Sequence, residues 1–282
     1  MKKILLVSII LLCNLFALEI SQSIVKNANT VSLEINKKNI SNVKLTFDKQ
    51  NINFFQNPFK ENIYYALLPI SYYQRQKDYR VIVSYIQDGK KVFEGKNLKV
   101  IDGKYKSEVI NVPKTKFRPK PSRAKRTKKE YSQAIKVYNT VSKEILWNEE
   151  FIYPLNSKIT SNFGTKRVYN GILKSYHSGT DFRAKNGTPI LASNSGIVRI
   201  SQDRFYSGNS IVIDHGQGVY SCYFHLSKMN YKVGDFIKKG DILGLSGDTG
   251  RVTGPHLHFS FRIHGIQVDP LDAISLLNKL KR

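Results

Sequence analysis

The chain has 282 residues and a formal net charge of +24, from 45 lysines and arginines against 21 aspartates and glutamates. This length accommodates one or two domains. Two cysteines are too few for a disulfide framework, and the basic excess favours acidic partners, either carboxylate-bearing peptides or, non-specifically, nucleic acid.

The first 17 residues have the pattern of a secretory signal peptide, with a basic start, an apolar stretch and Ala17 as a plausible cleavage residue. The apolar stretch is shorter than the roughly 20 residues that a membrane-spanning helix needs. We therefore expect cleavage, no transmembrane segment afterwards, and an exported protein in the periplasm or cell envelope. Cleavage would also remove Cys13 and leave Cys222 without a disulfide partner, although export would permit a disulfide.

Residues 18–112 have the features of an all-β domain. Apolar and polar residues alternate over 31–35, 43–47 and 79–86, as they do in half-buried strands. The Asp-Gly pair at 88–89 favours a hairpin turn. The segment contains no histidine and no cluster that suggests chemistry. We predict a β-sandwich-like module with a scaffold, recognition or regulatory role.

Residues 113–150 separate this module from the rest of the chain. The first part, 113–129, holds nine lysines or arginines, three prolines and no acid, which predicts a linker or exposed strap. From Glu130 to Trp147 apolar residues recur at the spacing of an amphipathic helix. On such a linker, the N-terminal module could either restrict access to a C-terminal site or dock a substrate there.

Two short runs in the C-terminal half carry the residues best suited to bind a metal ion. His256 and His258 lie in 255–263, where apolar residues alternate with polar ones. Alternation in a strand puts both imidazoles on one face, roughly 6–7 Å apart. One imidazole could hold a metal ion while the other works beside it.

The other run is His177-Ser178-Gly179-Thr180-Asp181. A straight strand would separate His177 from Asp181 by roughly 13 Å, too far to share one ion. We therefore predict a bend at Gly179, where the missing Cβ also leaves room for the metal. Together the two runs supply three ligands, the number that a catalytic zinc site takes from the protein, and one spare imidazole.

A further histidine, His225, lies in an alternating stretch with Cys222. Strict alternation puts the two on opposite faces, so Cys222 is expected to be a buried packing residue rather than a nucleophile. Alternation also turns His225 away from the apolar side. His215 is expected to be structural, and His264 lies roughly 20 Å along the strand from His258, too far to be a ligand.

The segment 151–271 resembles the catalytic domain of the lysostaphin/LytM-type zinc metallopeptidases, which cut peptide cross-links in bacterial cell walls. The motifs that carry the resemblance are ITSNFG at 159–164, HSGTDF at 177–182, GTPI at 187–190, IVIDHG at 211–216, YFHLS at 223–227, GDILG at 240–244 and TGPHLHF at 253–259. The resemblance implies that His177, Asp181 and His258 bind one zinc ion, and that His225 and His256 are catalytic.

The position of His256 beside the ligand His258 suggests how the two catalytic histidines would act. His256 would accept a proton as general base and His225 would help to hold the oxyanion, although the two roles could be exchanged. Some members of the family use an upstream tyrosine at the oxyanion, and here Tyr169 and Tyr176 are both candidates. The chain has no His-Glu-x-x-His run, so the helical zincin site is excluded.

The predicted fold is mainly β: the sandwich-like module, the basic linker and helix, an antiparallel β peptidase domain at 151–271, and a C-terminal tail at 272–282. The implied activity is zinc-dependent D,D-endopeptidase cleavage of D-alanyl cross-links, with D,D-carboxypeptidase action as a second activity and glycine bridges as an alternative substrate. The expected partners are peptidoglycan stem peptides and cross-links. Specific nucleic acid is not expected, because an exported chain rarely meets it.

A rival interpretation is a non-enzymatic activator of cell-wall amidases, a role of domains of this fold that have lost metal ligands. This chain keeps all three implied ligands and both auxiliary histidines, which favours the enzyme. The sequence leaves the oligomeric state open.

Overall fold

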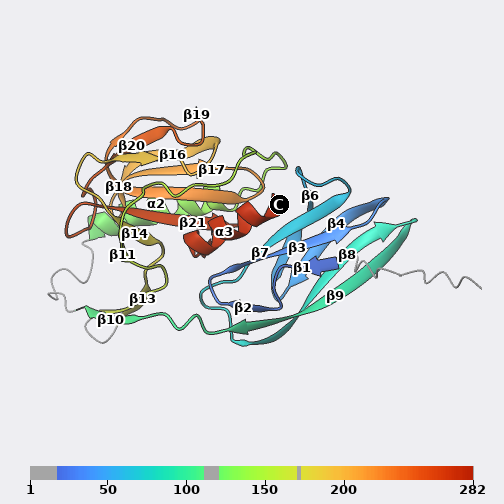
Figure 1. Cartoon of the computed structure of the whole chain (residues 1–282). Helices are drawn as coiled ribbons and strands as arrows, with labels where there is room; N and C mark the ends of the chain where they lie inside the picture. Colours follow the sequence, from blue (N-terminus) through green and yellow to red (C-terminus); the bar gives the residue numbers. More distant parts are fainter. Residues whose placement is uncertain (1–17, 111–120, 170–172, 282) are drawn as a thin grey trace, which may run out of the picture.

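Figure 1 shows the computed structural model of the chain, which describes residues 18–110, 121–169 and 173–281. The predicted signal peptide at 1–17 lies outside the described residues, as does the part of the basic strap at 113–120. Two β assemblies lie side by side, with helix α3 (Pro270–Leu280) between them.

The first assembly is a β-sandwich, as the sequence predicts. One sheet has the order β1 (Leu18–Ile20), β3 (Thr30–Asn36), β7 (Ile63–Pro69), β6 (Phe55–Gln56), and the other has the order β2 (Ile24–Lys26), β9 (Lys90–Ile101), β8 (Lys77–Gln87), β4 (Ile40–Phe47), β5 (Gln50–Asn53). Alternate residues of both sheets point inward and form one apolar core, which includes Leu33, Leu45, Leu68 and Val83.

The second assembly is built on a ten-stranded sheet. Its strands are β11 (Ile159–Ser161), β14 (Thr180–Arg183), β21 (His256–Ile263), β18 (Val219–Met229), β17 (Gly208–Asp214), β16 (Gly196–Arg204) and β19 (Phe236–Ile237), with β15 (Pro189–Leu191), β20 (Ile242–Ser246) and β22 (Ile266–Val268) at the sides. Leu257, Phe259 and Phe261 of β21 are fully buried in the core. The predicted alternation is confirmed, and it leaves His256 and His258 on the other face.

A small third sheet joins the two assemblies. Its strands are β10 (Ser107–Ile110), β12 (Lys166–Tyr169) and β13 (Leu173–Tyr176). β10, which follows the sandwich in the chain, runs parallel to β12, and β12 pairs antiparallel with β13. The hairpin that leads to His177 therefore carries a strand from the N-terminal side.

The helix predicted at 130–147 is present as α2, but its bounds are wrong: α2 spans Pro121–Tyr138. Proline is favoured at the first position of a helix, and the residues after it are mainly lysine, arginine and alanine with high helix propensity. The end of the basic strap is therefore helical. The chain beyond Tyr138 does not continue the helix, and Ile145 pairs with Gly216 instead.

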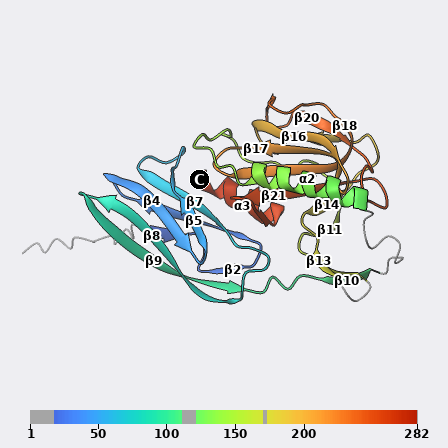
Figure 2. The ribbon, with the colours of Figure 1, turned by 180° about the vertical axis from the view of Figure 1, so that it is seen from behind.

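One face of α2 packs against strands β16, β17 and β18 (Figure 2). Ala134 and Tyr138 share a buried cluster there with Tyr220 and Cys222. Cys222 is fully buried, which confirms its expected packing role. Within the described ranges, no helix is long and apolar enough to cross a bilayer.

The segment 272–282, expected as a tail, instead supplies most of α3. Asp269 caps the helix by accepting a hydrogen bond from the Leu271 N–H at 3.0 Å. The buried residues of the helix, Ala273, Ile274, Leu277 and Leu280, follow the helical spacing of one face. That apolar face anchors the C-terminal segment on the core of the second assembly.

Strand β7 and helix α3 form a buried interface between the two assemblies. Tyr65 and Leu67 of β7 belong to the apolar core of the second assembly. Asp272 of α3 accepts hydrogen bonds from the Asn29 side chain at 2.7 Å and from the Thr30 backbone N–H at 3.0 Å. The N-terminal module therefore packs directly on the C-terminal domain.

The Asp272 carboxyl should make stability depend on pH. Burial raises its pKa from 3.8 to about 6, so between these values the native state binds a proton more tightly than the unfolded chain. The free energy of unfolding should fall as pH rises through this window, by roughly 3 kcal/mol from this group, and level off above it. Denaturant unfolding of the wild type and Asp272→Asn across the window measures the effect. The difference, wild type minus variant, should decrease with pH; a constant or increasing difference would contradict the pKa direction.

Candidate metal centre

The register of two neighbouring strands brings two of the predicted ligands together. β14 and β21 are antiparallel, and Asp181 lies directly opposite His258. Residues directly opposite on one face have Cβ atoms about 4.5–5.5 Å apart. The contact between Asp181 and His258 is therefore a consequence of sheet register.

His177 reaches the same point from the turn before β14. The chain bends at Gly179, as the sequence predicts. A Cβ at Gly179 would lie 2.5 Å from both His258 Nε2 and the Phe259 carbonyl oxygen. The His258 ring and the β21 backbone occupy the space that a Cβ at Gly179 would take, so a larger residue there would push them away.

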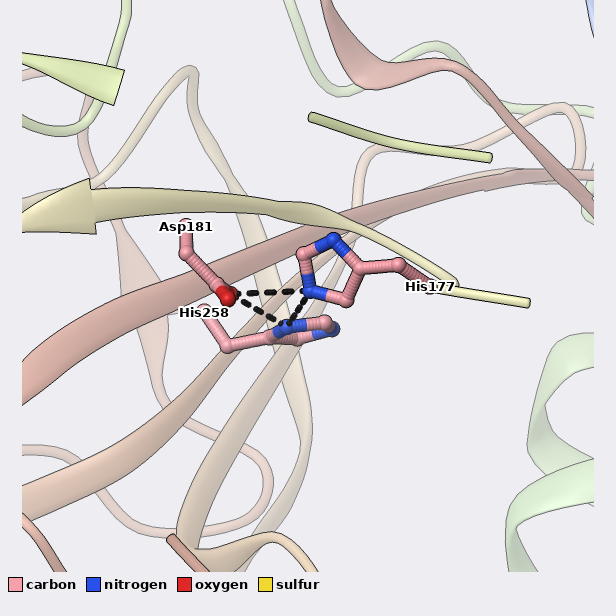
Figure 3. Close-up of side chains that lie close together, drawn as sticks. All are labelled: His177, Asp181 and His258. Carbon is pink, nitrogen blue, oxygen red and sulfur yellow. Dashed lines mark hydrogen bonds and ion pairs between the residues drawn. The ribbon is translucent and has the colours of Figure 1, made fainter. Parts of the chain in front are cut away.

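Three ligand atoms converge at this point (Figure 3). His177 Nε2 lies 3.0 Å from Asp181 Oδ1 and 3.0 Å from His258 Nδ1, and His258 Nδ1 lies 2.7 Å from Asp181 Oδ1. A tetrahedral zinc ion with bonds of about 2.0–2.1 Å separates its ligand atoms by roughly 3.3 Å. The triangle is close to this size and consists of imidazole nitrogens and a carboxylate oxygen, so the donor set fits a divalent metal ion.

Contacts behind His177 decide which of its nitrogens faces the cluster. His177 Nδ1 lies 2.9 Å from the Asn162 carbonyl oxygen and 3.2 Å from Ser161 Oγ. A carbonyl only accepts, so Nδ1 carries the proton and Nε2 keeps the free lone pair that a metal ligand needs. The sequence holds no signal for this role of Asn162, because the contact uses the backbone carbonyl, which every residue has.

Burial and charge set the protonation state of the cluster. Asp181 is 9% exposed, and burial alone would raise its pKa. The hydrogen bonds and charges of His177 and His258 outweigh burial and hold the pKa of Asp181 well below its usual range. Burial lowers the pKa of His258. Both directions favour the forms that bind a metal ion, an ionised carboxylate and a neutral imidazole.

His225 reaches the site through an irregularity that strict alternation does not predict. Alternation puts His225 on the face of Tyr223, which is buried in the main core. From the pair Tyr223–Ile211 to the pair Leu226–Asn209, β18 advances three residues (226 − 223) while β17 advances two (211 − 209). The extra residue makes a β-bulge, and His225 adopts the left-handed φ of 62° within it.

The bulge places His225 beside His256, with ring centroids 5.0 Å apart. His225 Nδ1 donates to the Thr249 carbonyl at 2.8 Å, and His256 Nδ1 donates to the Gly254 carbonyl at 2.9 Å. Each ring therefore keeps Nε2 available. His256 Nε2 lies 3.8 Å from Asp181 Oδ1, and burial lowers the pKa of His225 to about 4.

The other candidates lie outside this cluster. His215 is fully buried against Phe261, and His264 lies in the turn between β21 and β22. The hydroxyl of Tyr176, one of the two tyrosine candidates, donates to Gln267 at 3.2 Å. The Tyr169 side chain lies outside the described part of the structure.

Comparison with known proteins assigns this domain to a family. The profile described as Peptidase family M23 matches residues 175–270, a range that contains the four histidines and the aspartate of the predicted site. Residues 175–270 form an M23 peptidase domain. This match confirms the family resemblance that the sequence motifs carry.

Relatives with curated names match this M23 domain. Over 124 residues the chain is 42% identical to Peptidoglycan DD-endopeptidase ShyA of Vibrio cholerae, which covers 43% of this chain and 29% of that protein. Over 117 residues it is 38% identical to DD-carboxypeptidase/endopeptidase Mpg of Neisseria meningitidis, which covers 41% of this chain and 26% of that protein. The chain thus spans less than a third of the length of either relative.

One solved structure extends beyond the M23 domain. The crystal structure of a candidate M23 peptidase from Pseudomonas aeruginosa superposes with a TM-score of 0.64 at 24% identity, over 86% of this chain and 92% of that one. At this identity the likeness shows the fold alone. That fold includes part of the N-terminal sandwich, because the M23 domain covers a much smaller share of the chain.

Removing any one of the three converging side chains should cost the site most of its metal. We expect His177→Ala, Asp181→Asn and His258→Ala to lose bound zinc, because a three-ligand site depends on each ligand. Asp203→Asn is the matched control, since that carboxylate is exposed and pairs with Arg126 at the surface. Elemental analysis after dialysis gives the zinc content. A His177→Ala protein with wild-type zinc content would overturn the ligand set.

Proposed function

We propose that this chain is a zinc-dependent D,D-endopeptidase that cuts D-alanyl cross-links between peptidoglycan stem peptides in the periplasm or cell envelope. The observation that carries the proposal is the convergence of His177, Asp181 and His258 beside two further histidines. The M23 domain and the names of the relatives supply the reaction and substrate class. The net charge of +24 supports an acidic polymer as substrate.

In this proposal His177, Asp181 and His258 hold one zinc ion. The ion would polarise the scissile carbonyl and supply hydroxide near neutral pH. His256 accepts a proton at Nε2, which lies 3.8 Å from Asp181 Oδ1. The Nδ1–H of His225 is bound to the Thr249 carbonyl, so His225 can donate toward the oxyanion only through a protonated Nε2. Its lowered pKa of about 4 disfavours that form until negative charge develops beside the ring. Because both rings present Nε2, the two roles stay exchangeable within the proposal.

A non-enzymatic activator of amidases is the alternative function. It is disfavoured by the complete donor set and by the backbone contacts that orient both auxiliary histidines. A domain that had lost catalysis would have no need for an Nε2 presented by both of them. Carboxypeptidase action on uncross-linked stems remains part of the proposal because the name of the Mpg relative includes it.

Defined muropeptides test the proposal directly. Zinc-loaded protein is incubated with cross-linked dimers, uncross-linked pentapeptides and glycine-bridged dimers, and mass spectrometry identifies the products. We expect cross-linked dimers to become monomers by cleavage at the D-alanyl bond. Cleavage confined to the glycine bridge would overturn the D,D specificity. Stimulation of an added amidase with no cleavage of any substrate would favour the alternative.

Substitution of the auxiliary histidines should separate catalysis from metal binding. His225→Ala and His256→Ala should retain most of the zinc yet lose activity by roughly 100-fold or more, as expected for general acid–base residues. His264→Ala is the matched control, from the turn directly after the same strand, and should keep both properties. Zinc content and muropeptide turnover are measured on the same preparations. If His256→Ala loses zinc while His258→Ala keeps it, the roles on β21 are reversed.

A further inference from the structure

The chain segment that leads into His177 is held in part by residues that precede the matched range 175–270. His177 lies on a turn, and its backbone N–H donates to the Thr165 carbonyl at 2.9 Å. In return, the Gly164 N–H donates to the His177 carbonyl at 2.8 Å. The position of His177 therefore depends on the segment around Gly164, which precedes the matched range 175–270.

Tyr72 of the N-terminal module contacts both neighbours of His177. It follows strand β7, and its ring stacks on Tyr176 with centroids 3.9 Å apart and 6° between the planes. Its hydroxyl donates to the Gly164 carbonyl at 3.1 Å. Tyr176 is the residue directly before His177, and Gly164 holds the backbone of His177. The Tyr72 side chain therefore holds His177 in two ways: through its neighbour in the chain and through the segment that binds its backbone.

Tyr105 supports the same segment beside Tyr72, with the two ring centroids 5.2 Å apart. Its hydroxyl donates to the Asn27 carbonyl at 2.6 Å, within the sandwich. Its ring covers Gly164 so closely that a Cβ there would lie 2.2 Å from the ring, and it meets Phe163 edge-on at 6.3 Å. The pairing of β10 with β12 continues this support into the hairpin.

We infer that the N-terminal sandwich is a structural part of the metal centre, and that Tyr72 is a positioning residue for His177. The inference rests on the proposed role of His177 as a metal ligand. It differs from the access-restricting and substrate-docking roles, because breaking the contact should weaken the site itself. A ligand on a turn binds metal well only when its backbone is held in place, and outer partners of metal ligands commonly contribute 10–100-fold to affinity.

Variants of the full-length chain test this role by metal affinity rather than by turnover. Tyr72→Leu removes both the stack and the hydroxyl, whereas Tyr72→Phe keeps the stack. Tyr79→Leu is the matched control, because Tyr79 also packs in the sandwich, against Phe47 at 4.9 Å, but does not contact the His177 segment. Zinc affinity is measured by competition with a chromophoric chelator, and the visible spectrum of the Co²⁺-substituted protein reports the ligand geometry.

We expect Tyr72→Leu to weaken zinc binding by roughly tenfold or more and to alter the Co²⁺ spectrum. Tyr72→Phe loses only the hydroxyl bond to Gly164 and should lie between the wild type and Tyr72→Leu, and Tyr79→Leu should leave both readouts unchanged. If Tyr72→Leu does not fold, Tyr72→Met replaces it, because methionine fills an apolar gap without a ring. The same effect in the Tyr72 and Tyr79 variants, or none in the Tyr72 variants, would overturn the inference. His177→Ala, run alongside, separates the two failures: if it binds zinc normally, the proposed metal site is wrong, whatever Tyr72 does.

Discussion

The antiparallel register of β14 and β21 is the constraint on which the candidate metal centre depends. It sets Asp181 opposite His258, Thr180 opposite Phe259 and Phe182 opposite Leu257. Because side chains alternate between the two faces, a slip of one residue would exchange the buried aromatic and aliphatic residues for the site residues. Leu257 and Phe259 are fully buried, so such a slip would expose them and bury charged groups. The core that stabilises the sheet therefore also fixes two of the three proposed ligands.

The other two histidines of the site, His177 and His225, are not placed by this register. His177 lies on a turn and His225 on a bulge with a left-handed backbone, which costs a non-glycine residue on the order of 1–3 kcal/mol. Each is held by backbone hydrogen bonds instead: His225 donates its N–H to the Ser207 carbonyl at 2.9 Å and its Nδ1–H to Thr249. The site thus combines ligands set by the sheet with side chains placed by locally irregular backbone.

The same distinction explains how much the sequence could predict. Alternation of apolar residues predicted the face that His256 and His258 share, and the spacing of His177 and Asp181 required the bend at Gly179, because both follow from local geometry. The bulge at His225 was not predictable from alternation, since it arises from the pairing of β18 with β17, which are joined only in the folded sheet.

Helix bounds show the same limit. The predicted helix at 130–147 followed its apolar residues, but the observed α2 begins in the basic strap, where intrinsic propensity rather than apolar pattern favours a helix. Its end is followed by a stretch in which Ile145 pairs with Gly216, a contact distant in the sequence. The sequence does contain the signals for α3: Asp269 as a capping residue, Pro270 at the first helical position and apolar residues at helical spacing after it. The prediction of a tail at 272–282 missed these signals.

The buried residue Asn27 connects several segments at the interface between the sandwich and the M23 domain. The Asn27 amide donates to the Tyr72 carbonyl at 2.5 Å and accepts from the Gly103 N–H at 2.8 Å, while its own carbonyl accepts from Tyr105. The residues directly after it bind α3, through the Ala28 carbonyl, which accepts from the Asp269 N–H at 2.8 Å, and through the Asp272 contacts. A swing of the sandwich away from the M23 domain would break these contacts and the stack on Tyr176 together. Because all of these polar and aromatic contacts would have to be exchanged for contacts with water at once, control of the site by hinge motion of the sandwich is disfavoured. The module's contribution is therefore better sought in the rigidity that it gives to His177.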